Sequence, residues 1–65
     1  MKAALQVYSN GNWRTVAVGT PKECAKRARH YGYHLTITRV FYQGGRYPVQ
    51  EVLQWDDSYR PLPQD

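Results

Sequence analysis

The side chains with the clearest catalytic potential in this sequence are a lone cysteine, Cys24, and two histidines, His30 and His34. A thiolate beside a histidine can act as a nucleophile, and two histidines one helical turn apart can bind a metal. The sequence predicts a helix that ends at Gly32, however, so the two histidines fall on different elements. Cys24 lies on the apolar side of that helix and His30 on the opposite side. We therefore expect neither a nucleophile pair nor a metal site.

Two other short motifs also favour a non-catalytic protein. Adjacent acidic side chains, here Asp56 and Asp57, usually cap backbone amides in a turn. Gly44 and Gly45 precede a predicted strand, whereas a phosphate-binding loop precedes a helix. We expect no enzymatic activity and no cofactor.

Positive charge and aromatic rings are the remaining features that could serve a function. Nine Lys and Arg side chains outweigh five Asp and Glu side chains, which favours an anionic partner. The candidate partner- or nucleic-acid-binding residues are Lys22, Lys26, Arg27, Arg29, His30, Arg39, Tyr8 and Trp13. The solvated side of an amphipathic helix would show the same helix cations, and cross-strand stacking alone would account for the aromatic pair.

The first two elements that position these residues are strands over residues 3–8 and 13–18. They are rich in β-forming residues and flank Asn10-Gly11, a dipeptide typical of a tight hairpin turn. This turn predicts a register with the following pairs: Tyr8 with Trp13, Gln6 with Thr15, Ala4 with Ala17, Leu5 with Val16 and Ala3 with Val18. We expect the side that carries Leu5 to face the core.

The next element is a helix over about residues 21–31. Thr20 can cap its free amides, Pro21 suits the first helical position, and Glu23 completes a capping box. Gly32 supplies the left-handed residue that ends it. Helical spacing predicts a buried stripe made of Cys24, Ala25, Ala28 and Tyr31.

The second half of the chain predicts two more strands, Leu35–Tyr42 and Tyr47–Trp55, joined by a tight turn at Gly44-Gly45. The predicted pairs are Ile37 with Val52, Tyr42 with Tyr47, Val40 with Val49 and Thr38 with Glu51. The segment Asp56-Asp57-Ser58 predicts a turn, which a short edge strand at Tyr59-Arg60 would follow. The exposed side of this sheet is expected to show Tyr8, Trp13, Tyr42, Tyr47, Thr36, Thr38 and Gln6.

These elements predict a single domain over residues 1–65 in the α+β class. The expected architecture is a single antiparallel sheet of four or five strands, in the order β-β-α-β-β with a short fifth strand as an option, and one helix packed on one face. Its unpaired edges are compatible with a monomer or a weak homodimer. No stretch reaches the roughly 18 apolar residues of a membrane span, and a lone cysteine suits a reducing compartment. We expect a cytoplasmic protein without membrane contact.

Three segments carry a resemblance to a known family: the opening Met1-Lys2-Ala3-Ala4, the helical Ala25-Lys26-Arg27, and the strand 35–40 with Arg before an aliphatic residue. In these the chain resembles the small phage-encoded anti-CRISPR proteins that inhibit type I-F systems.

The resemblance implies a non-enzymatic inhibitor in the bacterial host. It would dock on the backbone subunits of a type I CRISPR surveillance complex and block pairing of target DNA with the guide. It would also contact DNA non-specifically through basic helix residues. Lys26 and Arg27 match the family's basic pair. The family's next basic position falls near Tyr31, where Arg29 or His30 would substitute.

Two alternatives stay open beside this main hypothesis. The chain could be a free nucleic-acid-binding module, because its cations suit phosphates and its flat rings suit unpaired bases. It could also inhibit a host protein. The β-β-α-β order and the strand Thr38-Arg39-Val40 are similar to small phage inhibitors of bacterial RNA polymerase. The known inhibitor of that kind is acidic, so the net charge of +4 argues against this third function.

Overall fold

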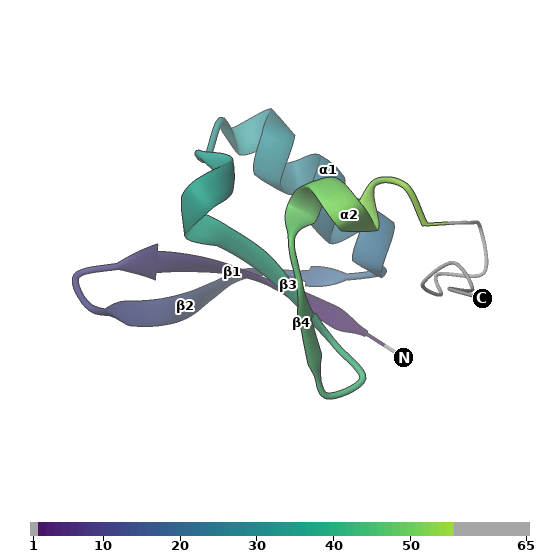
Figure 1. Ribbon diagram of the computed structural model, residues 1–65, viewed down its shortest axis with the longest axis horizontal. Coiled ribbons are helices and arrows are strands. Elements are labelled where there is room, and N and C mark those ends of the chain that lie inside the picture. The colour runs from purple at the N-terminus through teal and green to yellow at the C-terminus, as the bar shows by residue number, and fades with distance from the viewer. Residues whose placement is uncertain (1, 56–65) are drawn as a thin grey trace.

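The computed structural model describes residues 2–55, which form an antiparallel sheet with helices on it (Figure 1). The elements are β1 Ala3–Ser9, β2 Asn12–Gly19, α1 Pro21–Tyr31, the 3-10 helix η1 Leu35–Ile37, β3 Thr38–Tyr42, β4 Gly45–Tyr47 and α2 Val49–Val52. The four strands lie in the order β2-β1-β3-β4, and every neighbouring pair is antiparallel. The predicted α+β class and antiparallel sheet are confirmed.

The first hairpin turns at Asn10 and Gly11, which both have positive φ angles of 53° and 84°. Such a turn matches the twist of the flanking strands and fixes their register close to it. The predicted pairs Tyr8 with Trp13 and Gln6 with Thr15 are confirmed.

The predicted pairs farther from this turn are wrong, because a bulge shifts the register between Leu5 and Gln6. β2 has one extra residue there, Val16, as expected of a β-bulge. The observed pairs are Leu5 with Ala17, Ala4 with Val18 and Ala3 with Gly19.

Helix α1 has the predicted bounds and caps. The Thr20 hydroxyl accepts a hydrogen bond from the Glu23 amide at 3.2 Å, and the Glu23 carboxylate accepts one from the Thr20 amide at 2.9 Å. Gly32 ends the helix with a φ of 78°. Cys24, Ala25 and Ala28 are buried as predicted. Tyr31, expected on the same stripe, is 47% exposed, because the helix extends beyond the part that packs on the sheet.

The third strand begins three residues later than predicted. Residues 35–37 form η1, in which the His34 ring accepts a hydrogen bond from the Thr36 amide at 3.3 Å. The Thr38 hydroxyl donates to the Leu35 carbonyl at 3.1 Å. Such local side-chain contacts to the backbone compete with strand pairing, so β3 keeps only Thr38–Tyr42.

The second hairpin turns one residue earlier than predicted, at Gln43 and Gly44, whose φ angles are 51° and 82°. Tyr42 therefore lies opposite Gly45, and the remaining pairs are Phe41 with Arg46 and Val40 with Tyr47. The four pairs predicted for residues 37–52 are wrong.

The predicted strand Tyr47–Trp55 is also wrong beyond Tyr47. Pro48 lacks the amide proton that a strand ladder needs, and the chain turns into helix α2 directly after it. Val49, Val52 and Trp55 recur every three residues and are 1%, 0% and 3% exposed. Burial of this apolar face overrides the β propensity of valine. The turn predicted at 56–58 and the strand at 59–60 lie outside the described residues.

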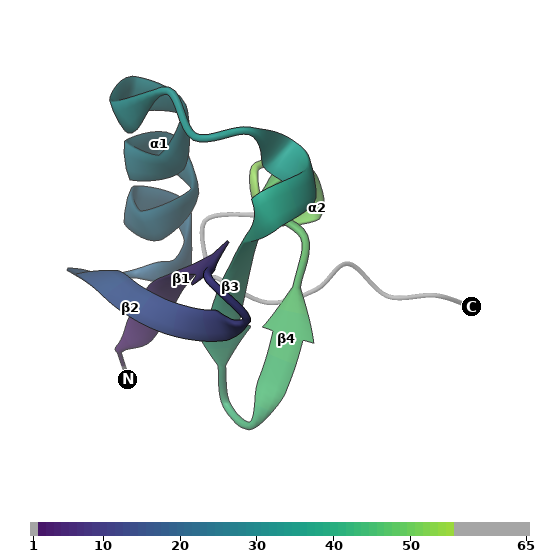
Figure 2. The same ribbon diagram turned by 90° about the vertical axis from the view of Figure 1, so that its left-hand side faces the viewer.

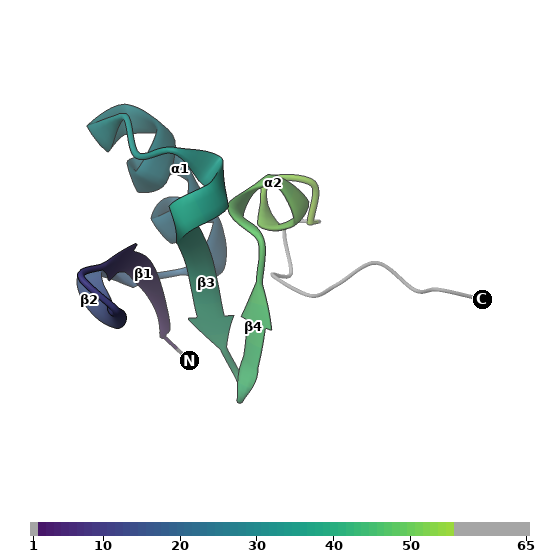
Figure 3. The same ribbon diagram turned by 60° about the vertical axis from the view of Figure 1, so that its left-hand side comes forward.

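All the described helices lie on the same face of the sheet, as Figures 2 and 3 show from two directions. The core between the two layers is centred on Leu5 and Val40, which are both fully buried. Tyr42 is on this side and only 8% exposed, and the ring centroid of Tyr47 lies 4.8 Å from that of Trp55. Thr38 is buried too. The prediction that these three side chains are on the exposed side is therefore wrong, and Thr36 belongs to η1.

Candidate nucleic-acid interface

The side of the sheet opposite α1 is not covered by any element of residues 2–55 (Figure 1). Side chains alternate between the two faces of a sheet along each strand, and residues paired across neighbouring strands lie on the same face. The register pairs Gln6 with Arg39, Tyr8 with Trp13 and Phe41 with Arg46. We call these six residues the open face: Gln6, Tyr8, Trp13, Arg39, Phe41 and Arg46.

The centre of the open face is a contact between Arg39 and Trp13. Arg39 extends from β3 across β1, and its Cζ lies 3.9 Å from the centroid of the Trp13 ring on β2. Its Nε donates a hydrogen bond of 2.7 Å to Oε1 of Gln6 on the intervening strand. A guanidinium so close to an indole face is attracted by the ring quadrupole. The hydrogen bond and the ring together fix the orientation of Arg39.

Tyr8 extends this cluster toward the first hairpin turn. Its ring centroid lies 5.3 Å from that of Trp13, with 61° between the ring planes. Both rings are accessible, since Tyr8 is 45% and Trp13 37% exposed. An edge-to-face pair stabilises the hairpin, and it also leaves ring surface available to a partner.

A second pairing of a cation with a ring lies beside the first. The Cζ of Arg46 on β4 is 5.8 Å from the centroid of the Phe41 ring on β3. Phe41 follows Arg39 by two residues on the same strand, so their Cα atoms are separated by about 7 Å. The open face therefore has two adjacent units, each with one guanidinium and at least one ring.

The electrostatic character of the open face is positive. Desolvation first, and then the charge of Arg46, lower the pKa of Arg39 from its ordinary value. The residues 2–55 contain eight of the nine Lys and Arg side chains and only two acidic ones, Glu23 and Glu51. These two belong to α1 and α2 on the other side of the sheet. No carboxylate within residues 2–55 neutralises the two guanidinium groups.

The cations predicted to form a binding surface on the helix lie on the opposite layer. Lys26, Arg27, Arg29 and His30 are exposed on α1, and Lys22 is half-buried. Arg27 donates a long hydrogen bond of 3.4 Å to the Tyr31 hydroxyl. The structure thus separates the eight predicted residues into two groups: Tyr8, Trp13 and Arg39 meet on the open face, and the other five are on α1.

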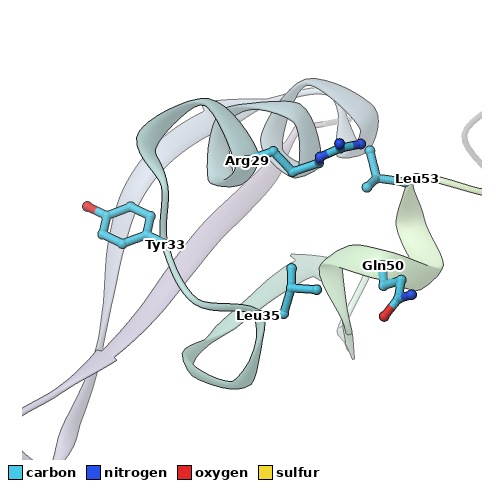
Figure 4. Close-up of a pocket in the computed structure, with 5 residues that line it drawn as sticks. All are labelled: Arg29, Tyr33, Leu35, Gln50 and Leu53. Atoms are coloured by element: carbon cyan, nitrogen blue, oxygen red, sulfur yellow. The ribbon is translucent and has the colours of Figure 1, made fainter.

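Arg29 also borders a shallow cavity of about 380 Å³ between α1, η1 and α2 (Figure 4). Leu35 and Leu53 line it with Gln50, and Arg29 extends along the helix side toward Leu53, whereas the Tyr33 ring points away from the others. The lining of this cavity is mixed, because two leucines lie beside a phenol, an amide and a single cation.

Cys24 and His30, the pair considered for nucleophilic catalysis, do not meet on α1. Cys24 is fully buried, and this burial raises the pKa of its thiol, which stays protonated. His30 is exposed on α1. Within residues 2–55 there is no group of three His, Cys, Asp or Glu side chains that could hold a metal ion. None of the described helices combines the length and apolar character of a membrane span.

Sequence reasoning missed Phe41 and Arg46 as part of the site. The prediction reversed which alternate residues of β3 face the helices. Tyr42 was therefore expected on the exposed side, and Phe41 was not considered. Arg39 was the available signal, because a cation rarely points into a core. Its exposure assigns Phe41, two residues on, to the same side and Val40 and Tyr42 to the core.

Compared with known proteins, the chain matches no protein-family model, no curated protein and no solved structure.

Proposed function

We propose that this protein is a non-enzymatic binding protein whose partner is nucleic acid, held on the open face. The observation that carries this proposal is the Arg39 guanidinium fixed against the Trp13 ring by Gln6, on an uncovered sheet surface. This arrangement orders a cation and exposed aromatic surface before any partner arrives, which lowers the entropy cost of binding.

Nucleic acid suits both components of the open face. Its phosphates are attracted by Arg39 and Arg46, which have no neutralising carboxylate among residues 2–55. Its bases can stack on Tyr8, on Phe41 and on the outer side of the Arg39 plane that Trp13 holds, because every base has a flat aromatic surface. A protein partner would use the same rings and arginines, which are enriched at protein interfaces, but two unneutralised guanidinium groups especially suit a polyanion.

The chemistry of the six side chains also favours binding over catalysis. Their polar groups are an amide, two guanidinium groups, a phenol and an indole. None of these is an imidazole, a carboxylate or a thiol, the groups that most often serve as a general acid, a general base or a nucleophile.

The proposal can be tested by fluorescence anisotropy with labelled oligonucleotides between about 50 and 200 mM salt. We expect binding that weakens with added salt, and a several-fold loss of affinity in the Arg39→Gln and Arg46→Gln variants. Lys26→Gln and Arg27→Gln remove the same charge from α1 and are the matched controls. If the wild-type protein has no affinity for any nucleic acid at low salt, the proposal is wrong and a protein partner becomes the occupant of this face.

We also propose a second function, inhibition of a type I-F CRISPR complex in the cytoplasm of a bacterial host. The exposure of Lys26 and Arg27 on α1 favours it, because these residues match the family's basic pair in the resemblance. The test is target-DNA binding by a purified type I-F complex with increasing amounts of this protein. Inhibition that is lost in a Lys26→Glu/Arg27→Glu variant would support the function, and full target binding at saturating protein would exclude it.

A further inference from the structure

We infer that the open face binds a single strand and holds two consecutive bases, one at each of its two cation-and-ring units. This inference rests on the proposed function and assigns its substrate class. The first unit consists of Tyr8, Trp13, Arg39 and Gln6, and the second consists of Phe41 and Arg46.

A single strand is favoured over a duplex because of where the rings lie. In a duplex the base surfaces are stacked on one another, so only the backbone and the groove edges reach a protein. Tyr8 and Trp13 present ring surface to solvent on strands of a sheet, with exposures of 45% and 37%. Four-stranded sheets with exposed rings use such surfaces to stack the unpaired bases of RNA.

Two bases are favoured by the spacing of the units along β3. Arg39 and Phe41 lie on the same side of this strand and are about 7 Å apart. Each unit supplies one guanidinium for a phosphate and ring surface for a base. The cross-strand partner of Phe41, Arg46, is at the edge of the described sheet on β4, so no third unit follows there within residues 2–55.

The two units differ in how a base can enter them. The guanidinium of Arg39 already contacts the indole at 3.9 Å, so no base fits between them. A base would stack instead on the outer side of the Arg39 plane or on Tyr8, and proteins use arginine planes in this way. At the second unit the distance from Arg46 to the Phe41 ring is 5.8 Å, and no hydrogen bond of the described structure holds Arg46 in place. A small movement of Arg46 would admit a base between it and Phe41.

The test uses hexanucleotides that carry the same number of phosphates but different numbers of bases. One, two or three adjacent thymines are placed in an otherwise abasic strand, and the affinity is measured by anisotropy with the full chain. Because one stacked base changes affinity by about 5- to 150-fold, we expect a gain of this size from one thymine to two. We expect little further gain from two thymines to three.

Variants of the rings provide the second part of the test. Tyr8→Ala and Phe41→Ala should each weaken binding of the two-thymine strand by at least about fivefold. Tyr8→Phe should retain most of the affinity, and far-ultraviolet circular dichroism checks that each variant is folded. For a duplex of equal length we expect weaker binding that neither ring variant changes.

The outcomes separate this inference from the proposed function. If duplex and single strand bind equally and the thymines add nothing, nucleic acid is still the partner, but the two-base single-strand site is refuted. A gain that continues equally to the third thymine refutes the two-base count. If neither strand form binds, the proposed function and this inference both fail.

Discussion

Arg39 and Trp13 lie on strands that are not neighbours, yet the Cζ of Arg39 is 3.9 Å from the centroid of the Trp13 ring. The side chain reaches this position by crossing β1, where Gln6 accepts a hydrogen bond from it. One contact therefore links three strands of the sheet on its uncovered side. The Trp13 ring and the Gln6 amide thus both hold the side chain of Arg39. The contribution of Gln6 to positioning Arg39 can be tested.

Replacing Gln6 by Ala removes the acceptor of the 2.7 Å hydrogen bond and leaves Arg39 free to adopt other rotamers. We expect the protein to stay folded and its affinity for a single-stranded oligonucleotide to fall several-fold. The affinity falls because a mobile Arg39 loses more conformational entropy on binding. Gln50→Ala, an exposed amide on α2, is the control. Equal affinities for wild type and Gln6→Ala would show that Gln6 does not position Arg39.

Leu5 anchors the core that packs the sheet against α1. It is fully buried at the centre of β1, between β2 and β3. Leu5→Ala should lower the free energy of unfolding by about 2–5 kcal/mol, because it removes buried methyl groups and leaves a cavity. Urea denaturation followed by circular dichroism measures the change. Val18→Ala, at a position 56% exposed, should cost under about 0.5 kcal/mol. A comparable loss in both variants would contradict this account of the core.

The capping box of α1 makes stability depend on acid. The hydrogen bond from the Thr20 amide, and then that with its hydroxyl, lower the pKa of Glu23 from its ordinary value of 4.5. A group whose pKa is lower in the folded state stabilises the fold above its unfolded pKa. This contribution is lost as the pH falls through the folded pKa.

We therefore expect the unfolding temperature of the wild type to fall on acidification below about pH 4.5 more steeply than that of Glu23→Gln. Glutamine keeps the acceptor oxygen and removes the titrating group. Thr20→Ala, which loses the cap itself, should reduce stability by about 1 kcal/mol at neutral pH. Identical acid dependence in wild type and Glu23→Gln would show that Glu23 does not couple to folding.

Local signals explain why the first half of the fold was predictable. The turn at Asn10-Gly11 and the capped helix Pro21–Tyr31 are each determined by residues close together in the sequence, and both are confirmed. The bulge at Val16 was not predictable, because nothing adjacent to it demands an extra residue in β2.

The second half depends on tertiary packing that the sequence pattern does not reveal. The glutamine at position 43 adopts a positive φ, although the two glycines directly after it could form a tight turn with less steric strain. Val49 and Val52 join a helix because it buries them with Trp55, against their β propensity. The candidate site was likewise predictable only in part. Residue type alone indicated Tyr8, Trp13 and Arg39, whereas Phe41 and Arg46 could be assigned to the open face only once the register of β3 was known.

The most direct test of the open face is the change in the indole and amide signals of a ¹⁵N-labelled sample when hexathymidylate is added. The two tryptophans are internal references for each other, because Trp13 lies on the open face and Trp55 is 3% exposed on the other side of the sheet. We expect the Trp13 indole and the Arg39 side-chain signal to shift, and the Trp55 indole and the amides of residues 26–30 to stay in place. Shifts confined to residues 26–30, with the Trp13 indole unchanged, would contradict binding on the open face and assign it to α1.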